Sequence, residues 1–171
     1  MKKHNGMRPQ DILILLKILA LEKEQFYLKD LSNQLGISSS EVTESVNRSV
    51  IAGLLAEDKR TIMRKALFEF LIHGLAYVFP QKPGSMVAGM PTAHSTAPLF
   101  QEFKSDEMYV WSDPKGNVKG QEIEPFHKGQ INAAKQYPKL YELLALSDAL
   151  RVGKVRERKM AEEELRKRIL R

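Results

Sequence analysis

No cysteine occurs anywhere in the sequence. This absence excludes a disulfide framework and any zinc site built on thiolates. The four histidines are scattered and show neither the H-x-x-x-H nor the H-E-x-x-H spacing of helical metal sites; they are His4, His73, His94 and His127. We therefore expect no metal and no cofactor.

Long apolar stretches are also missing. The longest, residues 12–21, is interrupted by Lys17 and is far shorter than the roughly 20 residues that cross a bilayer. Lys2 and Lys3 precede it, but no small-residue cleavage site follows, so the start of the chain does not resemble a secretory signal. We expect no contact with a membrane and a cytoplasmic location.

Motifs for catalysis are equally scarce. Gly84 and Gly89 are not followed by the Gly-Lys-Ser/Thr of a phosphate-binding loop. His94 and Ser95 are neighbours in the proline- and glycine-rich stretch 81–99, but sequence proximity does not make a catalytic pair. A nucleophile and its base must meet in space with a third, orienting group. We expect that the protein is not an enzyme.

The charge is positive overall and uneven along the chain. The sequence has 27 lysines and arginines against 21 acidic residues, a net charge of +6. Residues 1–60 are almost balanced, with 9 basic and 8 acidic side chains, whereas residues 151–171 carry 9 and 4. A basic protein suits a polyanionic partner. The basic C-terminal helix therefore either contacts nucleic acid or a protein partner, or is a solvated helix with internal ion pairs.

Residues 28–55 contain two short helical patterns joined by a glycine turn. In the first, Leu28, Leu31 and Leu35 recur at the spacing of one helix face. Gly36 follows where a left-handed residue ends a helix. Ser38 then opens the second helix with the capping-box spacing to Glu41, and Val42, Val46 and Val50 make its inward face.

This stretch resembles the helix-turn-helix of winged-helix transcriptional regulators of the MarR and ArsR families. The resemblance rests on the segments 30–32, 35–38 and 53–55 together with Val42 and Val46. Ser32 stands where these families usually have alanine. Ser49 replaces an inward leucine, which indicates a looser core or a serine bonded to its own helix.

The resemblance implies a sequence-specific DNA-binding regulator that acts on double-stranded DNA as a homodimer, with the C-terminal helices forming the dimer. Residues 39–52 would enter the major groove as the recognition helix. Asn47 and Arg48 are the candidates for base edges, since these side chains match adenine and guanine. The remaining candidates for DNA contacts are Ser39, Ser40, Thr43 and Glu44 on the same helix and Lys59, Arg60, Arg64 and Lys65 after it.

The fold predicted from the whole pattern is α+β and mainly helical. A winged-helix-like domain would cover residues 7–60, and residues 61–171 would form a helical region with a small β-hairpin for dimerisation or for binding a partner or effector. The wing itself is shortened or replaced, because no alternating strand pair surrounds the polar residues 56–61. The further elements expected are helices at 9–21, 62–73, 131–137, 140–152 and 155–170, short strands at 26–27 and 75–79, and a hairpin of 108–111 with 118–123 around the turn 113–117.

Two points of interpretation stay open at this stage. The hairpin at 108–123 is either a displaced wing or a small sheet in which Trp111, the only tryptophan, anchors the core. The alternative function is a protein-interaction module, such as an antitoxin or adaptor. In that case residues 61–171 would hold a protein partner, and the helix-turn-helix would serve autoregulation.

Overall fold

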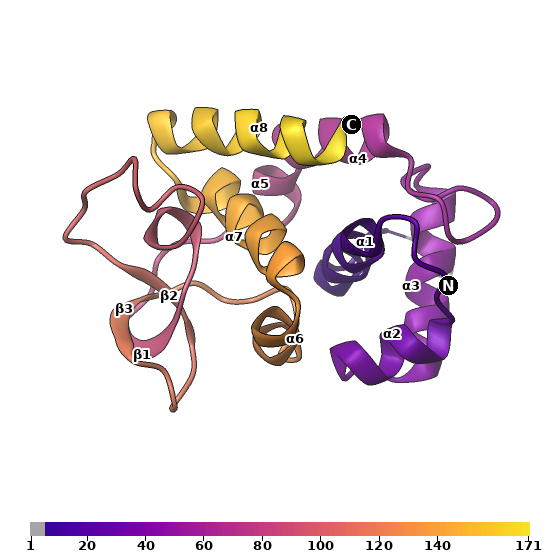
Figure 1. The fold of residues 1–171 in the computed structure, drawn as a ribbon, viewed down its shortest axis with the longest axis horizontal. Coiled ribbons are helices and arrows are strands. Elements are labelled where there is room, and N and C mark those ends of the chain that lie inside the picture. The colour runs from indigo at the N-terminus through magenta and orange to yellow at the C-terminus, as the bar shows by residue number, and fades with distance from the viewer. Residues whose placement is uncertain (1–5) are drawn as a thin grey trace.

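The computed structural model describes residues 6–171, so Lys2, Lys3 and His4 lie outside the described residues. The described part is an α+β fold, mainly helical, with a small three-stranded sheet (Figure 1). The helices are α1 (Pro9–Leu21), α2 (Leu28–Leu35), α3 (Ser39–Ile51), α4 (Arg64–His73), α5 (Leu75–Val78), α6 (Gln130–Gln136), α7 (Pro138–Val152) and α8 (Val155–Ile169), with a 3-10 turn η1 (Ala93–Ser95); the strands are β1 (Met86–Pro91), β2 (Tyr109–Ser112) and β3 (Val118–Glu122).

Helix α1 connects the two ends of the molecule. Figure 1 shows α2 and α3 on one side of α1, the sheet at the opposite end, and α7 between α1 and the sheet. Helix α1 packs against α3 and also against α7. Because it has neighbours on both sides, all residues from Asp11 to Leu19 are buried, as expected for a helix that is apolar around most of its circumference.

The N-terminal and C-terminal helices match the sequence prediction within two residues or fewer at most ends, whereas two short strands were predicted wrongly. Residues 26–27 form no strand, and Tyr27 is instead the N-cap of α2, with its N–H donated to Asp30. The segment expected as a strand at 75–79 contains α5. The chain stays helical after Gly74, because the N–H groups of Val78 and Phe79 are donated to the carbonyls four residues earlier, as in an α-helix.

The predicted β-hairpin is also wrong, although both of its strands exist. Strands β2 and β3 pair in parallel, and each pairs antiparallel with β1, so the three strands close on one another. Strand β1 comes from the stretch 81–99, which the sequence presented as an irregular loop. The turn at 113–117 is present, with the N–H of Gly116 donated to the carbonyl of Asp113. The strand that follows it, β3, runs antiparallel to β1 and not antiparallel to β2.

Glycines make this closure possible. A Cβ on Gly89 would lie 2.0 Å from the carbonyl oxygen of Trp111, and one on Gly120 would lie 2.6 Å from that of Met108. Only residues without a side chain allow backbones to approach so closely. The backbones of the three strands therefore lie close together at these two glycines. Trp111 is fully buried, as the core-anchor interpretation requires, and donates its indole N–H to Asp148 on α7 at 2.7 Å.

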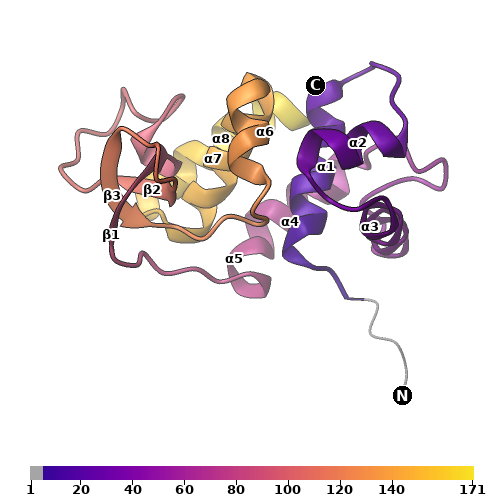
Figure 2. The same ribbon diagram turned by 90° about the horizontal axis from the view of Figure 1, so that it is seen from below.

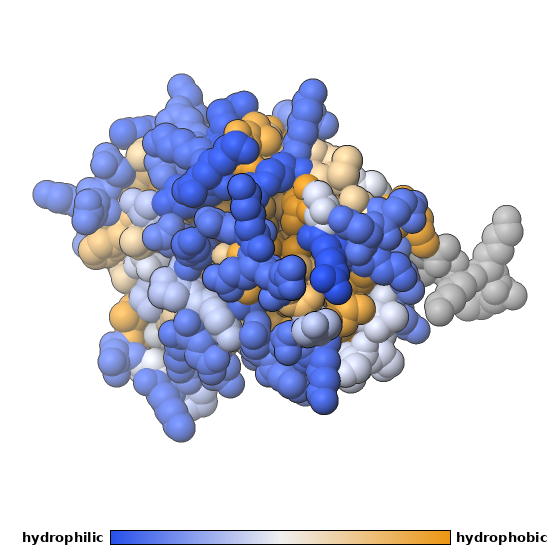
Figure 3. Space-filling view, turned by 45° about the vertical axis from the view of Figure 1, so that its right-hand side comes forward, coloured by the Kyte–Doolittle hydropathy of each residue, from blue (hydrophilic) through white to orange (hydrophobic). Residues whose placement is uncertain are grey.

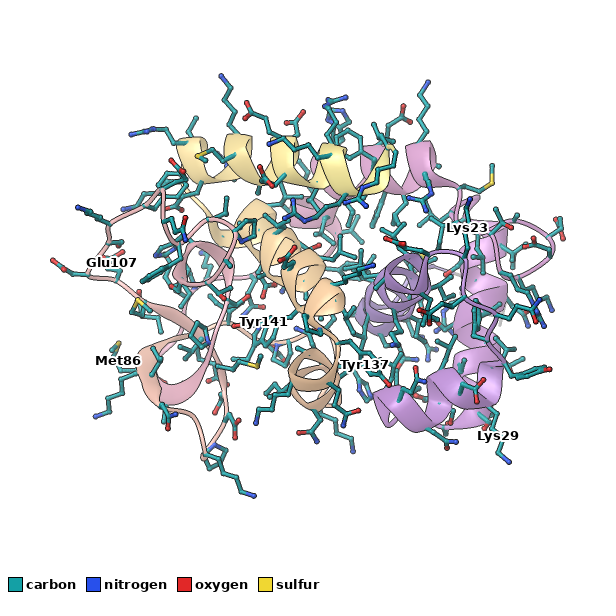
Figure 4. All side chains as sticks on the ribbon, viewed as in Figure 1. Lys23, Lys29, Met86, Glu107, Tyr137 and Tyr141 are labelled. Atoms are coloured by element: carbon teal, nitrogen blue, oxygen red, sulfur yellow. The ribbon has the colours of Figure 1, made fainter. Side chains whose placement is uncertain are left out.

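A lysine is buried where α1 meets the C-terminal helices. Lys17 is 1% exposed, and its Nζ lies 3.0 Å from the centroid of the Tyr137 ring, at the junction of α6 and α7 (Figure 4). Loss of hydration lowers the pKa of Lys17 to about 8, against a smaller opposing effect of Glu24. The charged ammonium is thus less stable in the folded protein than in the unfolded chain.

Replacing this lysine should stabilise the protein in a pH-dependent manner. The pKa of Lys17 is lower in the folded state, so the unfolded chain binds more protons between about pH 8 and 10.5, and stability due to this group rises with pH in that window. We expect Lys17→Met to raise the free energy of unfolding by about 1–2 kcal/mol at pH 7. The gain should shrink toward pH 10, as measured by urea denaturation. Lys159→Met, on the exposed side of α8, is the control; a loss of stability in Lys17→Met at every pH would contradict the assignment.

Candidate nucleic-acid interface

The turn between α2 and α3 is held by local hydrogen bonds. Gly36 has φ +64°, in the left-handed region, and ends α2 as predicted. The N–H of Ile37 is donated to the carbonyl of Ser32 at 3.2 Å, and the Ser32 hydroxyl is donated to the carbonyl of Ile37 at 2.6 Å. The Ser32 side chain therefore stabilises the turn by a hydrogen bond across it.

Helix α3 begins with the predicted cap. The Ser38 hydroxyl accepts the N–H of Glu41 at 3.3 Å, which satisfies one of the free donors at a helix N-terminus. The hydroxyl of Ser49 is buried without a hydrogen-bond partner among the described residues, so the predicted bond of this serine to its own helix is wrong. Helix α2 is supported from the other side by α6, where Gly129 lets the Leu35 carbonyl oxygen come within 1.9 Å of the place a Cβ would occupy.

The carboxylate of Asp11 fastens α3 to α1. It is completely buried and accepts Nε and Nη2 of Arg48 at 2.9 and 2.7 Å. It also accepts the hydroxyl of Ser45 and the backbone N–H of Arg8, the latter at 2.9 Å. One side chain thus caps the start of α1 and holds two positions of α3, and we call this group the Asp11 clamp.

Arg48 is therefore not available for a base edge, and its assignment to that role is corrected. It is 7% exposed, and the hydrogen bonds that it donates to Asp11 raise its pKa above the ordinary value. Its spacing of three residues from the inward Ser45 placed it on the buried side of α3. The partner that draws it inward lies 37 residues earlier in the chain.

The other predicted residues of α3 do lie on one exposed face. Ser39, Ser40, Thr43, Glu44 and Asn47 are all exposed, and in Figures 1 and 2 α3 lies at the edge of the molecule, on the side away from the sheet. The Thr43 hydroxyl is donated to the carbonyl of Ser39 at 3.0 Å, which leaves its lone pairs free to accept. These five side chains form what we call the outer face of α3.

Sequence reasoning missed one member of this face. Ile51 is 67% exposed and follows Asn47 by four residues, so the two share a side of the helix. The spacing alone could have revealed it, because the inward positions Val42, Val46 and Val50 leave Ile51 outside the apolar stripe.

A tight turn follows α3 where a wing was expected to be shortened or replaced. Leu55 and Ile62 form a single antiparallel bridge, and Asp58 accepts the N–H groups of Arg60 and Thr61, both at 2.8 Å. These bonds, with the Thr61 hydroxyl, lower the pKa of Asp58 below its ordinary value. Lys59 at the tip has φ +59°. Lys59 and Arg60 are both exposed.

The two cations predicted on the next helix separate in role. Arg64 is half-buried and donates Nη1 to the carbonyl of Ile169 at 3.0 Å, so it joins α4 to the end of α8. Lys65 is exposed. Of the ten predicted DNA-contact residues, the structure thus buries Arg48 and uses Arg64 for packing, and it leaves the other eight exposed.

A hollow of about 420 Å³ lies beside the turn, between it and the end of α1. Its lining includes the apolar side chains of Ile18, Phe26 and Ile62. It also includes charged side chains of both signs, among them Lys23, Arg60, Glu22, Glu24 and Asp58. Figure 3 shows apolar surface between polar side chains on the side of the molecule that faces the viewer. Because acidic and basic side chains both line this hollow, its charge does not point to one class of ligand.

No family model, no curated protein and no solved structure matches the chain. Within residues 6–171 no group of three or more histidine or acidic side chains is placed to hold a metal ion. None of the described helices is long and apolar enough to span a membrane.

Breaking the Asp11 clamp should destabilise the fold. We expect Arg48→Ala to lower the free energy of unfolding by about 3–5 kcal/mol, because the buried Asp11 carboxylate loses the guanidinium with which it is paired. Asn47→Ala, at the next position but exposed, should change it by no more than about 0.5 kcal/mol. Urea denaturation measures the free energy of unfolding of both variants, and equal values would show that the Asp11 clamp does not stabilise the fold.

Proposed function

We propose that the protein is a sequence-specific DNA-binding transcriptional regulator that places α3 in the major groove. The observation that carries the proposal is the division of α3 into two sides. Its inner side is held to α1 through the Asp11 clamp, while the mostly polar side chains of its outer face are exposed within the part of the chain that the structure describes. A short helix that is rigidly held and uncovered is what groove recognition requires.

The side chains on the outer face have the size and chemistry for base contacts. The Asn47 amide can donate and accept on one adenine edge. Ile51 lies one turn further along and suits the methyl group of thymine. Ser39 and Ser40, at the start of the helix, are placed for phosphate oxygens, as helix N-termini commonly are. Glu44 can accept from cytosine or repel an unsuitable base.

Cations on both sides of α3 would meet the phosphate backbone. Lys29 on α2 and the pair Lys59 and Arg60 on the turn after α3 are exposed. We read this turn, with its single bridge between Leu55 and Ile62, as a minimal wing of a winged-helix domain of the MarR and ArsR kind. Such a role agrees with the cytoplasmic location that the sequence predicts.

The proposed regulator acts as a homodimer, and α8 offers it a charged surface rather than an apolar one. Helix α8 buries Ala161, Leu165 and Ile169 within its own chain and turns mostly charged residues outward. An interface on α8 would therefore be polar, unlike the apolar centre of most permanent dimers.

A second function retains support from the charge of the outer face. Glu41 and Glu44 are exposed on α3, and no exposed arginine accompanies them on the helix. Two large apolar side chains are exposed on the same pair of helices: Ile51 at the end of α3, and Tyr27, 71% exposed, at the N-cap of α2. Exposed acidic and apolar side chains also suit a protein partner. In this reading the chain is an antitoxin- or adaptor-like interaction module, with a partner held by α3 or by residues 61–171.

Selection of random duplexes by the purified protein, followed by fluorescence anisotropy on the selected sequence, tests the proposal. We expect Asn47→Ala to weaken binding about 5- to 160-fold, equivalent to about 1–3 kcal/mol, and to relax the preference at one base pair. Asn132→Ala, the same change at an exposed position of α6, should leave affinity unchanged.

The salt dependence provides a second measure. Three phosphate contacts in each protomer, from Lys29, Lys59 and Arg60, predict a slope of log K against log salt of about −2.7 per protomer. Binding that shows no sequence preference and does not respond to Asn47→Ala would overturn the proposal and favour the interaction module.

A further inference from the structure

The chain buries two arginines, and they are satisfied very differently. Arg48 makes two charge-assisted hydrogen bonds of 2.7 and 2.9 Å to one carboxylate. Arg151 on α7, with a side chain only 4% exposed, makes one contact of 3.4 Å to Asp148 and one of 3.2 Å to the neutral amide oxygen of Gln81. Its buried Nε has no hydrogen-bond partner among residues 6–171. A desolvated cation without a close anion is costly.

The neighbouring acid does not make up for this deficit. Asp148 is completely buried, and its Oδ2 already accepts the Thr92 hydroxyl and the Trp111 indole N–H, both at 2.7 Å. Burial raises the pKa of Asp148 and lowers the pKa of Arg151, in each case as the largest effect. At 3.4 Å the Asp148–Arg151 contact is also longer than the 2.7 Å contact between Arg48 and Asp11. The closest other support for Arg151 is the Phe126 ring, whose centroid lies 4.5 Å from its guanidinium carbon.

Arg151 also lines a cavity of about 290 Å³. Phe79, Phe126 and Pro125 give this cavity apolar walls, and Pro9 at the start of α1 closes one side. Glu124 is its only acidic lining residue and is exposed. The cavity thus combines an apolar body with one under-paired planar cation, which is the usual composition of a small-molecule site.

We propose that this cavity binds a small organic monocarboxylate, whose carboxylate pairs with the guanidinium of Arg151 and whose apolar part lies against Phe79 and Phe126. The planar guanidinium matches a carboxylate in geometry. Glu124 selects against ligands with several negative charges, because it would repel a second anionic group at the opening.

The position of the cavity gives such a ligand a route to the DNA-binding helix. Pro9 contributes to the cavity wall, and Asp11, two residues further on, holds Arg48 and Ser45 of α3. A ligand that presses on or orders the start of α1 acts directly on the Asp11 clamp. Binding in the cavity does not depend on the proposed DNA-binding function; only this consequence of it does.

The test is an NMR titration of the ¹⁵N-labelled full chain with acetate, hexanoate and phenylacetate, each beside its neutral amide. We expect at least one carboxylate to shift the Arg151 Nε–H signal and to bind at least tenfold more tightly than its amide. Arg151→Gln should remove this difference. No preference for any of the three carboxylates over its amide would overturn the proposal.

A rim variant guards against the case in which Arg151→Gln does not fold. Glu124→Gln removes an exposed negative charge from the opening and should tighten carboxylate binding about threefold, while the affinity for the amide stays the same. Glu163→Gln, the same change on the exposed side of α8, should alter neither. Unchanged carboxylate affinity in Glu124→Gln would place the ligand outside this cavity and contradict the proposal.

Discussion

The buried carboxylate of Asp11 is the contact on which the arrangement of the N-terminal helices depends. It satisfies a free N–H at the start of α1 and binds Ser45 and Arg48 of α3. A buried charge is costly unless it is paired. Because the partners of Asp11 on α3 are Ser45 and Arg48, α3 is held with these two side chains toward α1. The orientation has a direct consequence, because it turns Arg48 inward and leaves the short polar side chains of the outer face toward solvent.

Helix α1 extends this constraint to the rest of the molecule. Its buried side chains belong to one continuous core with those of α7 and α8, and the domain boundary at residue 60 stays a prediction. The under-paired Arg151 lies beside the first residue of that helix. The proposed DNA-binding face and the proposed carboxylate cavity are thus joined by a single rigid element, which is the kind of physical connection that coupling between sites requires.

Much of the helical part could be predicted from the sequence, because its signals are local. The apolar spacing, Gly36 and the Ser38 cap define α2 and α3 within a few residues of chain. The sheet could not be predicted in the same way. Strand β1 has no apolar alternation, and its pairing with β2 and β3 depends on close approach at Gly89 and Gly120. The inward position of Arg48 was missed for a related reason, since the carboxylate that pairs with it lies 37 residues earlier in the chain.

The central claim is that the outer face of α3 is the surface that binds DNA. An NMR titration of the ¹⁵N-labelled protein with its selected duplex tests it most directly. We expect the amide shifts to concentrate at residues 39–47, at Ile51 and in the turn 57–60, with little change along α8. Shifts confined to the basic residues of α8, with α3 unaffected, would show that DNA meets only the charged C-terminal helix and would contradict the claim.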